Sequence, residues 1–296
     1  MEITLDWLKN AMAETGYISE DEINMAVFLA LNLEKPLLIT GAPGVGKTEL
    51  AKVLSKIFQT ELIRLQCYEG LDESKALYEW NYQKQLLSIQ LGKEQGANKI
   101  EQDLFSENYL LPRPLLKALR AEQKPVLLID EIDKTDEEFE AFLLEILSDF
   151  QVSIPELGTV RANQIPIVVL TSNAERELSD GLKRRCIYLN IDYPRIDKEL
   201  AILNAKVPGI DRRLAQEVAK AVQLVRSLEI QKKPSIAETI DWAKALVLLG
   251  AENLTPNLVE KTTNLLLKDK HDVDNFNRDM GSRCLCSKVQ GRECNE

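Results

Sequence analysis

Short apolar runs alternate with longer amphipathic ones between residues 36 and 191, and this alternation restricts the fold more than any other feature of the chain. The short runs are rich in Leu, Ile and Val, as expected of strands that helices cover on both faces. The pattern therefore predicts an α/β fold with a five-stranded parallel sheet built from βαβ units. The strands are expected at 36–40, 62–66, 126–130, 165–172 and 186–191.

Two connections in this region are longer than a βαβ unit requires. Residues 67–111 are polar and contain several aromatic side chains, which indicates an insertion with helical pieces. Loops of that length without a function are uncommon in compact domains. Residues 150–162 contain two β-like runs around a Pro-Glu-Leu-Gly turn, which predicts a hairpin directly before the fourth strand.

The pattern changes after residue 192, where the predicted strands stop. Leu, Ile, Val and Ala then recur at helical spacing in three segments, 211–228, 236–249 and 256–267. We therefore predict a core domain over 1–192 and a small all-α domain over 193–268. Residues 269–296 show no periodicity and contain many turn-forming residues, so we expect this tail to be mostly disordered.

The chain of 296 residues carries 37 basic and 47 acidic side chains, a net charge of −10. This excess of acid argues against a scaffold that overall charge steers onto nucleic acid or an anionic membrane. The longest apolar runs are far shorter than the roughly 20 residues that span a bilayer. The N-terminus carries early acids and lacks the basic and apolar regions of a secretory signal, so we expect a cytoplasmic protein.

The five cysteines are unevenly distributed. Cys67 and Cys186 are isolated, whereas Cys284, Cys286 and Cys294 lie close together near the C-terminus. An odd and scattered set predicts reduced thiols rather than a disulfide framework. The three tail cysteines lack the paired spacing of a zinc site, so we expect them to belong to a free tail.

A phosphate-binding loop follows the first predicted strand. Its sequence matches G-x-x-x-x-G-K-[ST] between a strand and a helix, which is the context that the motif requires. Glycines let consecutive backbone N–H groups turn inward around an anion at the helix N-terminus. The lysine neutralises the β- and γ-phosphates and the threonine hydroxyl ligates Mg²⁺. The eight residues are Gly41, Ala42, Pro43, Gly44, Val45, Gly46, Lys47 and Thr48.

The third predicted strand ends in acidic residues. Asp130 is placed to hold the Mg²⁺ shell through water, and Glu131 to polarise the attacking water as a general base. Buried strands often end in solvated acids, so this pattern is weak by itself. Because the phosphate-binding loop precedes it in the same series of βαβ units, we predict a site for ATP and Mg²⁺.

Three further residues are candidates for the reaction. Asn173 closes the fourth predicted strand and can hydrogen-bond the γ-phosphate and water if that strand lies between the two motifs; otherwise it is a turn residue. Arg184 and Arg185 precede the fifth strand and can reach a neighbouring subunit as arginine fingers. The alternative is a cationic helix C-terminus that the helix dipole favours.

These motifs together resemble the AAA+ ATPases over about residues 16–268, and within that superfamily the MoxR group and its CoxD-like branch. The segments that carry the resemblance are LLITGAPGVGKTELAK, RLQCYEGLDESKALYEWNYQKQLL, LLIDEIDK, the hairpin before TSN, GLKRRCIYLNIDYP and KKPSIAETIDWAKAL.

The resemblance implies an αβα core, a helical lid and ATP hydrolysis between subunits of a homo-oligomeric ring, typically a hexamer. Gly41 to Thr48 would be the Walker A loop, Asp130 and Glu131 the Walker B pair, Asn173 sensor 1, and Arg184 or Arg185 the finger that acts in trans. The insertion and the hairpin would face the pore or a substrate. One departure is that 234–238 lacks the sensor 2 arginine; Lys233 either substitutes for it or is a solvated lysine beside the helix cap.

For function, the resemblance implies a chaperone-like remodeller that activates a partner, often one with a von Willebrand factor A domain. The CoxD-like branch suggests maturation of a metalloenzyme client. One alternative is an ATP-driven DNA remodeller, although the sequence offers no basic tract interleaved with aromatic residues. Another alternative, motivated by the missing arginine, is a nucleotide-gated binding module with little turnover.

Overall fold

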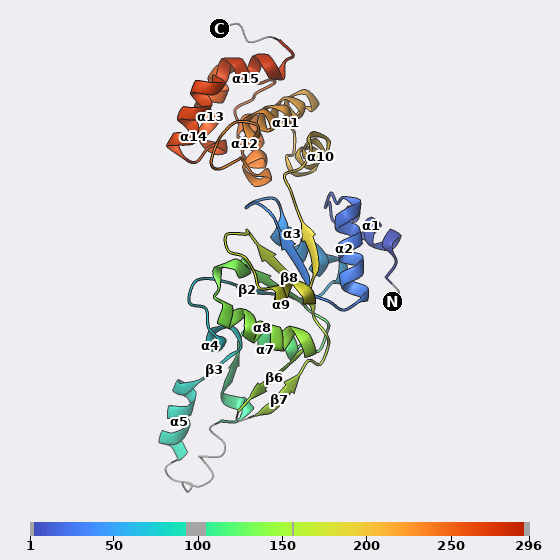
Figure 1. Ribbon diagram of the computed structural model, residues 1–296, viewed down its shortest axis with the longest axis vertical. Helices are drawn as coiled ribbons and strands as arrows, with labels where there is room; N and C mark the ends of the chain where they lie inside the picture. Colours follow the sequence, from blue (N-terminus) through green and yellow to red (C-terminus); the bar gives the residue numbers. More distant parts are fainter. Residues whose placement is uncertain (1–2, 93–104, 156, 293–296) are drawn as a thin grey trace. The chain divides into compact units, whose positions relative to one another are not determined.

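The computed structural model describes residues 3–92, 105–155 and 157–292 (Figure 1). It divides into two compact units, of which the first comprises residues 1–41 and 47–190 and the second residues 42–46 and 191–296. No helix in the described ranges is long and apolar enough to cross a membrane.

The first unit is built on a five-stranded sheet in which all pairs are parallel, in the order β2-β5-β8-β1-β9. Its strands are β1 (Leu37–Thr40), β2 (Leu62–Gln66), β5 (Val126–Asp130), β8 (Ile167–Ser172) and β9 (Ile187–Asn190). The predicted sheet is therefore confirmed, with ends within two residues of those expected. Because β8 lies between β1 and β5, the carboxyl ends of these three strands lie side by side.

Helices cover this sheet and explain why the interior strand β5 is apolar from Val126 to Ile129. All five residues of β5 are buried. Leu127 and Ile129 share one core cluster with Leu116 of α7 and Leu143 of α8. The helices of the unit are α1 (Leu5–Glu14), α2 (Asp21–Asn32), α3 (Lys47–Phe58), α7 (Pro114–Leu119), α8 (Glu137–Asp149) and α9 (Asp180–Arg185), with a 3₁₀ turn η2 at Ile132–Lys134.

The long connection after β2 contains more than helical pieces. Its described elements are α4 (Glu73–Ala76), β3 (Tyr78–Trp80), α5 (Tyr82–Gly92), the 3₁₀ turn η1 (Glu107–Tyr109) and β4 (Leu110–Pro112). β3 and β4 pair antiparallel as a separate two-stranded sheet, with Trp80 opposite Leu110. The segment 93–104 lies outside the described residues.

A hairpin precedes β8. It consists of β6 (Gln151–Ile154) and β7 (Gly158–Arg161), which pair antiparallel. Val152 and Ile154 of β6 are buried in the same core cluster as α8. The hairpin is therefore anchored by one face of one strand, while most of β7 is exposed.

The second unit has six helices among its described residues (Figure 1). They are α10 (Ile196–Lys206), α11 (Arg212–Arg226), α12 (Ile236–Leu248), α13 (Pro256–Leu266), α14 (Lys270–Asp279) and α15 (Gly281–Val289). Their apolar faces meet around Trp242 and Phe276, which are among the largest fully buried side chains. Ser235 and Glu238 form a reciprocal capping box at the start of α12, which fixes where that helix begins.

The predicted disorder of the tail from 269 is wrong for residues 270–289, which form α14 and α15. The segment is polar on average, but Leu285 and Val289 are four residues apart and buried on one face of α15. The Asp272 carboxylate also accepts hydrogen bonds from the backbone N–H groups of Gln231 and Lys232. A few well-spaced apolar residues and one buried carboxylate are therefore enough to hold this region.

The cysteines differ from the predicted set of reduced thiols. Cys67, Cys186 and Cys286 are free. Cys284, however, is disulfide-bonded. Position 294 lies outside the described residues. Within the described part of the chain, no cluster of His, Cys, Asp and Glu side chains is arranged to hold a metal ion.

Candidate functional site

The loop between β1 and α3 has the backbone of an anion-binding turn. Gly41, Gly44 and Gly46 adopt positive φ angles of 147°, 74° and 99°. Only glycine takes such angles without strain, so the glycine spacing of the motif is required by the conformation. The loop ends where α3 begins at Lys47. A helix N-terminus carries unpaired N–H groups and the positive end of the dipole, which favours a phosphate.

The Lys47 side chain connects this loop to the end of β8. Its ammonium donates to the carbonyl oxygen of Gly41 at 2.5 Å and to Oδ1 of Asn173 at 2.8 Å. Burial lowers the pKa of Lys47 from its usual value, while the carboxylates of Asp133, Asp130 and Glu131 oppose that shift. The site therefore surrounds a largely dehydrated ammonium with acids, and the candidate residue Asn173 lies within hydrogen-bond distance of it.

The Thr48 hydroxyl and the Asp130 carboxylate lie together. Thr48 Oγ1 donates to Asp130 Oδ1 at 3.0 Å, and Thr171 Oγ1 donates to the same oxygen at 2.5 Å. Asp130 is only 3% exposed. A hydroxyl and a carboxylate are the hard oxygen ligands that Mg²⁺ prefers. Together with the adjacent ammonium, these groups fit a magnesium–nucleotide complex.

The second oxygen of Asp130 is bound by a residue that the sequence pattern does not single out. Arg64 on β2 donates to Asp130 Oδ2 at 2.5 Å, and the same guanidinium nitrogen donates to Oε1 of Gln66. Gln66 Nε2 in turn donates to Oε2 of Glu131 at 3.1 Å. The sequence pattern that could have pointed to Arg64 and Gln66 is the alternation in β2. These two polar residues occupy one face of the strand, while Ile63 and Leu65 are buried on the other.

Glu131 has a strained backbone. It adopts the left-handed conformation, with φ 59° and ψ 51°, and its N–H donates to Thr171 Oγ1 at 2.9 Å. A residue other than glycine pays of order 1 kcal/mol or more for such a conformation. Strain of this kind, held by a buried hydroxyl, favours the hypothesis that the direction of the Glu131 side chain matters for function.

Asp133 positions the turn that follows β8. Its Oδ2 accepts from the N–H groups of Asn173 and Glu175 at 3.1 and 3.0 Å. Its Oδ1 is buried and has no hydrogen-bond partner among the described residues. Between the two bound residues, Ala174 has a positive φ of 59°. The buried Asp133 carboxylate therefore fixes the backbone N–H of Asn173 and the turn that begins there.

The two candidate arginines are on α9, one bonded to α8 and one exposed. Arg185 Nε donates to Ser148 Oγ on α8 at 2.6 Å, and its NH1 group donates to the Gly181 carbonyl at 3.3 Å. Arg184 is exposed at the last turn of α9. The hydrogen bonds that hold Arg185 run to α8 and within α9. A role in trans therefore remains a prediction, as does the helix-dipole alternative.

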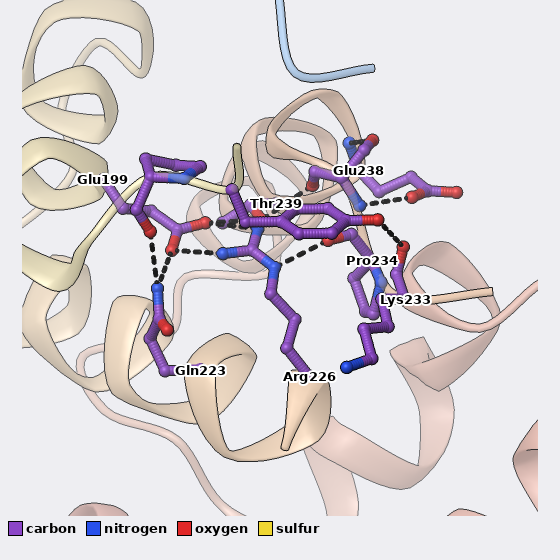
Figure 2. Close-up of polar contacts among 10 residues, drawn as sticks. Glu199, Gln223, Arg226, Lys233, Pro234, Glu238 and Thr239 are labelled. Carbon is purple, nitrogen blue, oxygen red and sulfur yellow. Dashed lines mark hydrogen bonds and ion pairs between the residues drawn. The ribbon is translucent and has the colours of Figure 1, made fainter. Parts of the chain in front are cut away.

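Lys233 lies in the second unit, just before α12 (Figure 2). Its carbonyl oxygen accepts from the Tyr193 hydroxyl at 3.4 Å. The neighbouring Pro234 carbonyl accepts from Nε of the buried Arg226 at 2.7 Å. The backbone around Lys233 is therefore held by two side chains, and a nucleotide-directed role for its ammonium stays a prediction.

Comparison with known proteins places these features in a family. The family model described as AAA domain (dynein-related subfamily) matches residues 36–186, which include the loop, β5, β8 and α9. An uncharacterized protein of Staphylococcus haemolyticus is 26% identical over 269 residues, which cover 88% of this chain and 93% of that protein. The chaperone protein ClpB of Bacillus cereus is 28% identical over 149 residues, which cover 49% of this chain and 15% of ClpB.

A solved structure shares the fold. A point mutant of RuvB from Thermotoga maritima aligns with a TM-score of 0.51 and 18% sequence identity, covering 94% of this chain and 75% of that one. At this identity the likeness concerns the fold alone. It agrees with the parallel sheet and the following helices described above.

Proposed function

The chain belongs to the AAA-domain family, in its dynein-related subfamily, and on that premise we propose that it binds ATP with Mg²⁺ and hydrolyses the terminal phosphate. The observation that carries the proposal is the cluster at the carboxyl edge of the sheet, where Lys47 bonds Asn173 and Thr48 bonds Asp130. Residues from three separate strand ends meet there, each of a type that phosphoryl transfer needs.

In the proposed reaction, the loop N–H groups and Lys47 would hold the phosphates, and Thr48 with Asp130 would hold Mg²⁺. The ion neutralises charge on the phosphate oxygens when it is bound. Glu131 would accept a proton from the attacking water as the water oxygen bonds to the γ-phosphorus, and the bond between the γ-phosphorus and the bridging oxygen would break to leave ADP and inorganic phosphate. Gln66 orients the Glu131 carboxylate through its amide, and Asn173, fixed by Asp133, orients the water or the γ-phosphate.

The direct test is phosphate release from Mg²⁺·ATP by the wild-type protein and by Glu131→Gln. Loss of a general base costs about 10²- to 10⁴-fold in rate, so we expect a drop of that size with ATP binding retained. Glu138→Gln removes an exposed acid on α8, only a few residues away, and should leave the rate unchanged. Equal rates in Glu131→Gln and wild type would refute the assignment.

The same assay separates an ATPase from a nucleotide-gated binding module. Tight ATP binding with single-turnover hydrolysis near background in the wild-type protein would favour the module. Multiple turnovers that need Glu131 would favour the ATPase.

We also propose a homo-oligomeric ring, a hexamer, in which Arg184 or Arg185 acts on the neighbouring site, as the MoxR resemblance implies. The exposure of Arg184 supports this reading. Specific ATPase activity should then rise with protein concentration. Arg184→Ala and Arg185→Ala should bind ATP normally but lose this rise, whereas Arg283→Ala, an exposed arginine in the second unit, should keep it. Constant specific activity at all concentrations would contradict a shared site.

For the use of the energy, we propose chaperone-like remodelling of a partner protein. The supporting observation is the insertion, where Tyr82, Leu86 and Leu87 of α5 are 61%, 59% and 59% exposed. Exposed apolar side chains gathered on one helix are suited to contact another polypeptide. The MoxR and CoxD-like resemblance makes a von Willebrand factor A domain protein and a metalloenzyme client the candidates. ATP-dependent co-purification of such a partner, lost in Leu86→Ser/Leu87→Ser, would support this; capture without regard to nucleotide would count against it.

A further inference from the structure

Arg64 connects both acids of the proposed active site. Its guanidinium donates to Asp130 Oδ2 at 2.5 Å. The other oxygen of that carboxylate is already bound by the hydroxyls of Thr48 and Thr171. Both carboxylate oxygens of Asp130 are therefore engaged by protein donors, and one of those donors carries a full positive charge.

We infer that Arg64 competes with Mg²⁺ for Asp130, so that the arginine sets how much Mg²⁺ the site needs to bind a nucleotide. The inference rests on the proposed function. A divalent cation with its ligands and a guanidinium beside the same carboxylate repel each other, and both depend on the negative charge of Asp130. Asp130 therefore binds either Arg64 or Mg²⁺, and not both at once.

The two partners differ in their freedom to separate. The Asp130 side chain is 4% exposed, whereas the Arg64 side chain is 51% exposed. Arg64 also lies on β2, the edge strand of the sheet. A half-exposed guanidinium can exchange its carboxylate for water, because solvent already reaches it beside Asp130. Asp130, held by two hydroxyls in the core, stays in place while Arg64 moves.

The competition extends to the catalytic carboxylate. The nitrogen that bonds Asp130 also donates to Oε1 of Gln66, and Gln66 Nε2 donates to Glu131. When Arg64 moves away from Asp130, Gln66 loses the guanidinium that donates to its side-chain oxygen. The position of the Gln66 amide, and with it the hydrogen bond to Glu131, then changes. Arg64 is thus a positioning residue that couples the magnesium site to the proposed general base.

The test is the affinity of a non-hydrolysable ATP analogue, measured in EDTA and at a series of Mg²⁺ concentrations. Arg64→Met keeps the length of the side chain and removes its charge. In EDTA we expect weaker binding by the variant, because Asp130 then faces the triphosphate without a counter-ion. With Mg²⁺ we expect the variant to bind the analogue at least as tightly as wild type. We also expect its half-saturating Mg²⁺ concentration to fall roughly fivefold, which corresponds to the largest interaction free energy, about 1 kcal/mol, measured for ion pairs with an exposed partner.

Two further variants serve as controls. Arg113→Met removes an arginine of similar exposure, paired with Glu79 in the insertion, and should leave both affinities and the Mg²⁺ requirement unchanged. Arg64→Lys keeps a charge at the same position of β2 and should show a Mg²⁺ requirement close to wild type. If Arg64→Met fails to fold, as judged by its thermal midpoint, Arg64→Gln provides the same comparison.

Each remaining outcome overturns the inference. If Arg64→Met binds the analogue with the wild-type Mg²⁺ dependence, Arg64 does not compete for Asp130. If it binds more weakly by the same factor with and without Mg²⁺, the arginine stays on Asp130 beside the ion. If the wild-type protein binds no nucleotide under either condition, the proposed function fails and the inference fails with it.

Discussion

A buried ion pair in the second unit leads to the strongest prediction about stability. Glu199 on α10 is fully buried, and Arg226 on α11 is 6% exposed. Arg226 donates through two nitrogens to the two Glu199 oxygens, each at 2.8 Å (Figure 2). The carboxylate also accepts from Thr239 Oγ1 of α12 and from Gln223 Nε2, while the guanidinium lies over the Tyr193 ring. This network joins three helices.

Replacing Arg226 with Met leaves the Glu199 carboxylate buried without its counter-ion. Breaking such a pair by removing one partner costs about 3–5 kcal/mol. Whole domains are stable by only about 5–15 kcal/mol, so the variant should bring the second unit close to unfolding. Replacing both partners, as in Glu199→Leu/Arg226→Met, removes the unpaired charge together with the pair. The double variant should therefore be more stable than either single variant.

The assay is urea unfolding followed by Trp242 fluorescence in a Trp7→Phe/Trp80→Phe background. Trp242 lies in the core of the second unit, so its emission reports that unit alone. Arg278→Met breaks an exposed pair with Asp279 on α14 and should leave the midpoint unchanged. A loss below about 1 kcal/mol for Arg226→Met, or a double variant whose loss equals the sum of the singles, would refute the reasoning.

Three further predictions follow from single features. Because burial lowers the pKa of Lys47, its proton is lost at lower pH than that of an exposed lysine, and ATP affinity should fall with rising pH before the usual lysine pKa of about 10.4 is reached; a flat titration would contradict this. Asp133→Ala should reduce ATP hydrolysis more than ATP binding, since it releases the Asn173 turn, and wild-type kinetics would count against that role. Truncation after 280 should lower the unfolding midpoint reported by Trp242, because it removes the buried Leu285.

The sheet and the phosphate-binding loop could be predicted because their signals are local. Each strand is a continuous apolar run, and the loop is a contiguous motif between a strand and a helix. The condition placed on Asn173, that its strand lie between the two motifs, is met by the order β5-β8-β1. Strand neighbours in a parallel sheet are set by crossover topology, which the sequence pattern alone does not specify.

The roles of Arg64 and Gln66 could not be predicted, because the sequence pattern does not specify which strand lies beside β2. Their importance depends on β2 pairing with β5 in the register that sets Gln66 opposite Asp130. A different neighbour for β2 would have left them as ordinary exposed residues on one face of a strand. Asp133 belongs to the acidic run after β5, but its role depends on the turn after β8, which is 40 residues further along the chain.

The prediction for the C-terminal region is wrong for a different physical reason. Composition and periodicity average over many residues, and 270–289 is polar on average. Its helices are stabilised by tertiary packing of a few positions, such as Phe276 and Val289, against the rest of the second unit. Most helix stability in proteins comes from such packing rather than from intrinsic propensity, so a weak pattern does not by itself imply disorder.

The central claim is that the loop from Gly41 to Thr48 holds a triphosphate through Lys47. The most direct measurement is equilibrium binding of ATP, ADP and AMP with Mg²⁺ to the wild-type protein, to Lys47→Ala and to Lys52→Ala. Lys52 is an exposed lysine on the same helix, paired with Glu49. We predict that wild type and Lys52→Ala bind ATP and ADP far more tightly than AMP, and that Lys47→Ala loses this preference. Binding of ATP by Lys47→Ala with wild-type affinity would contradict the account.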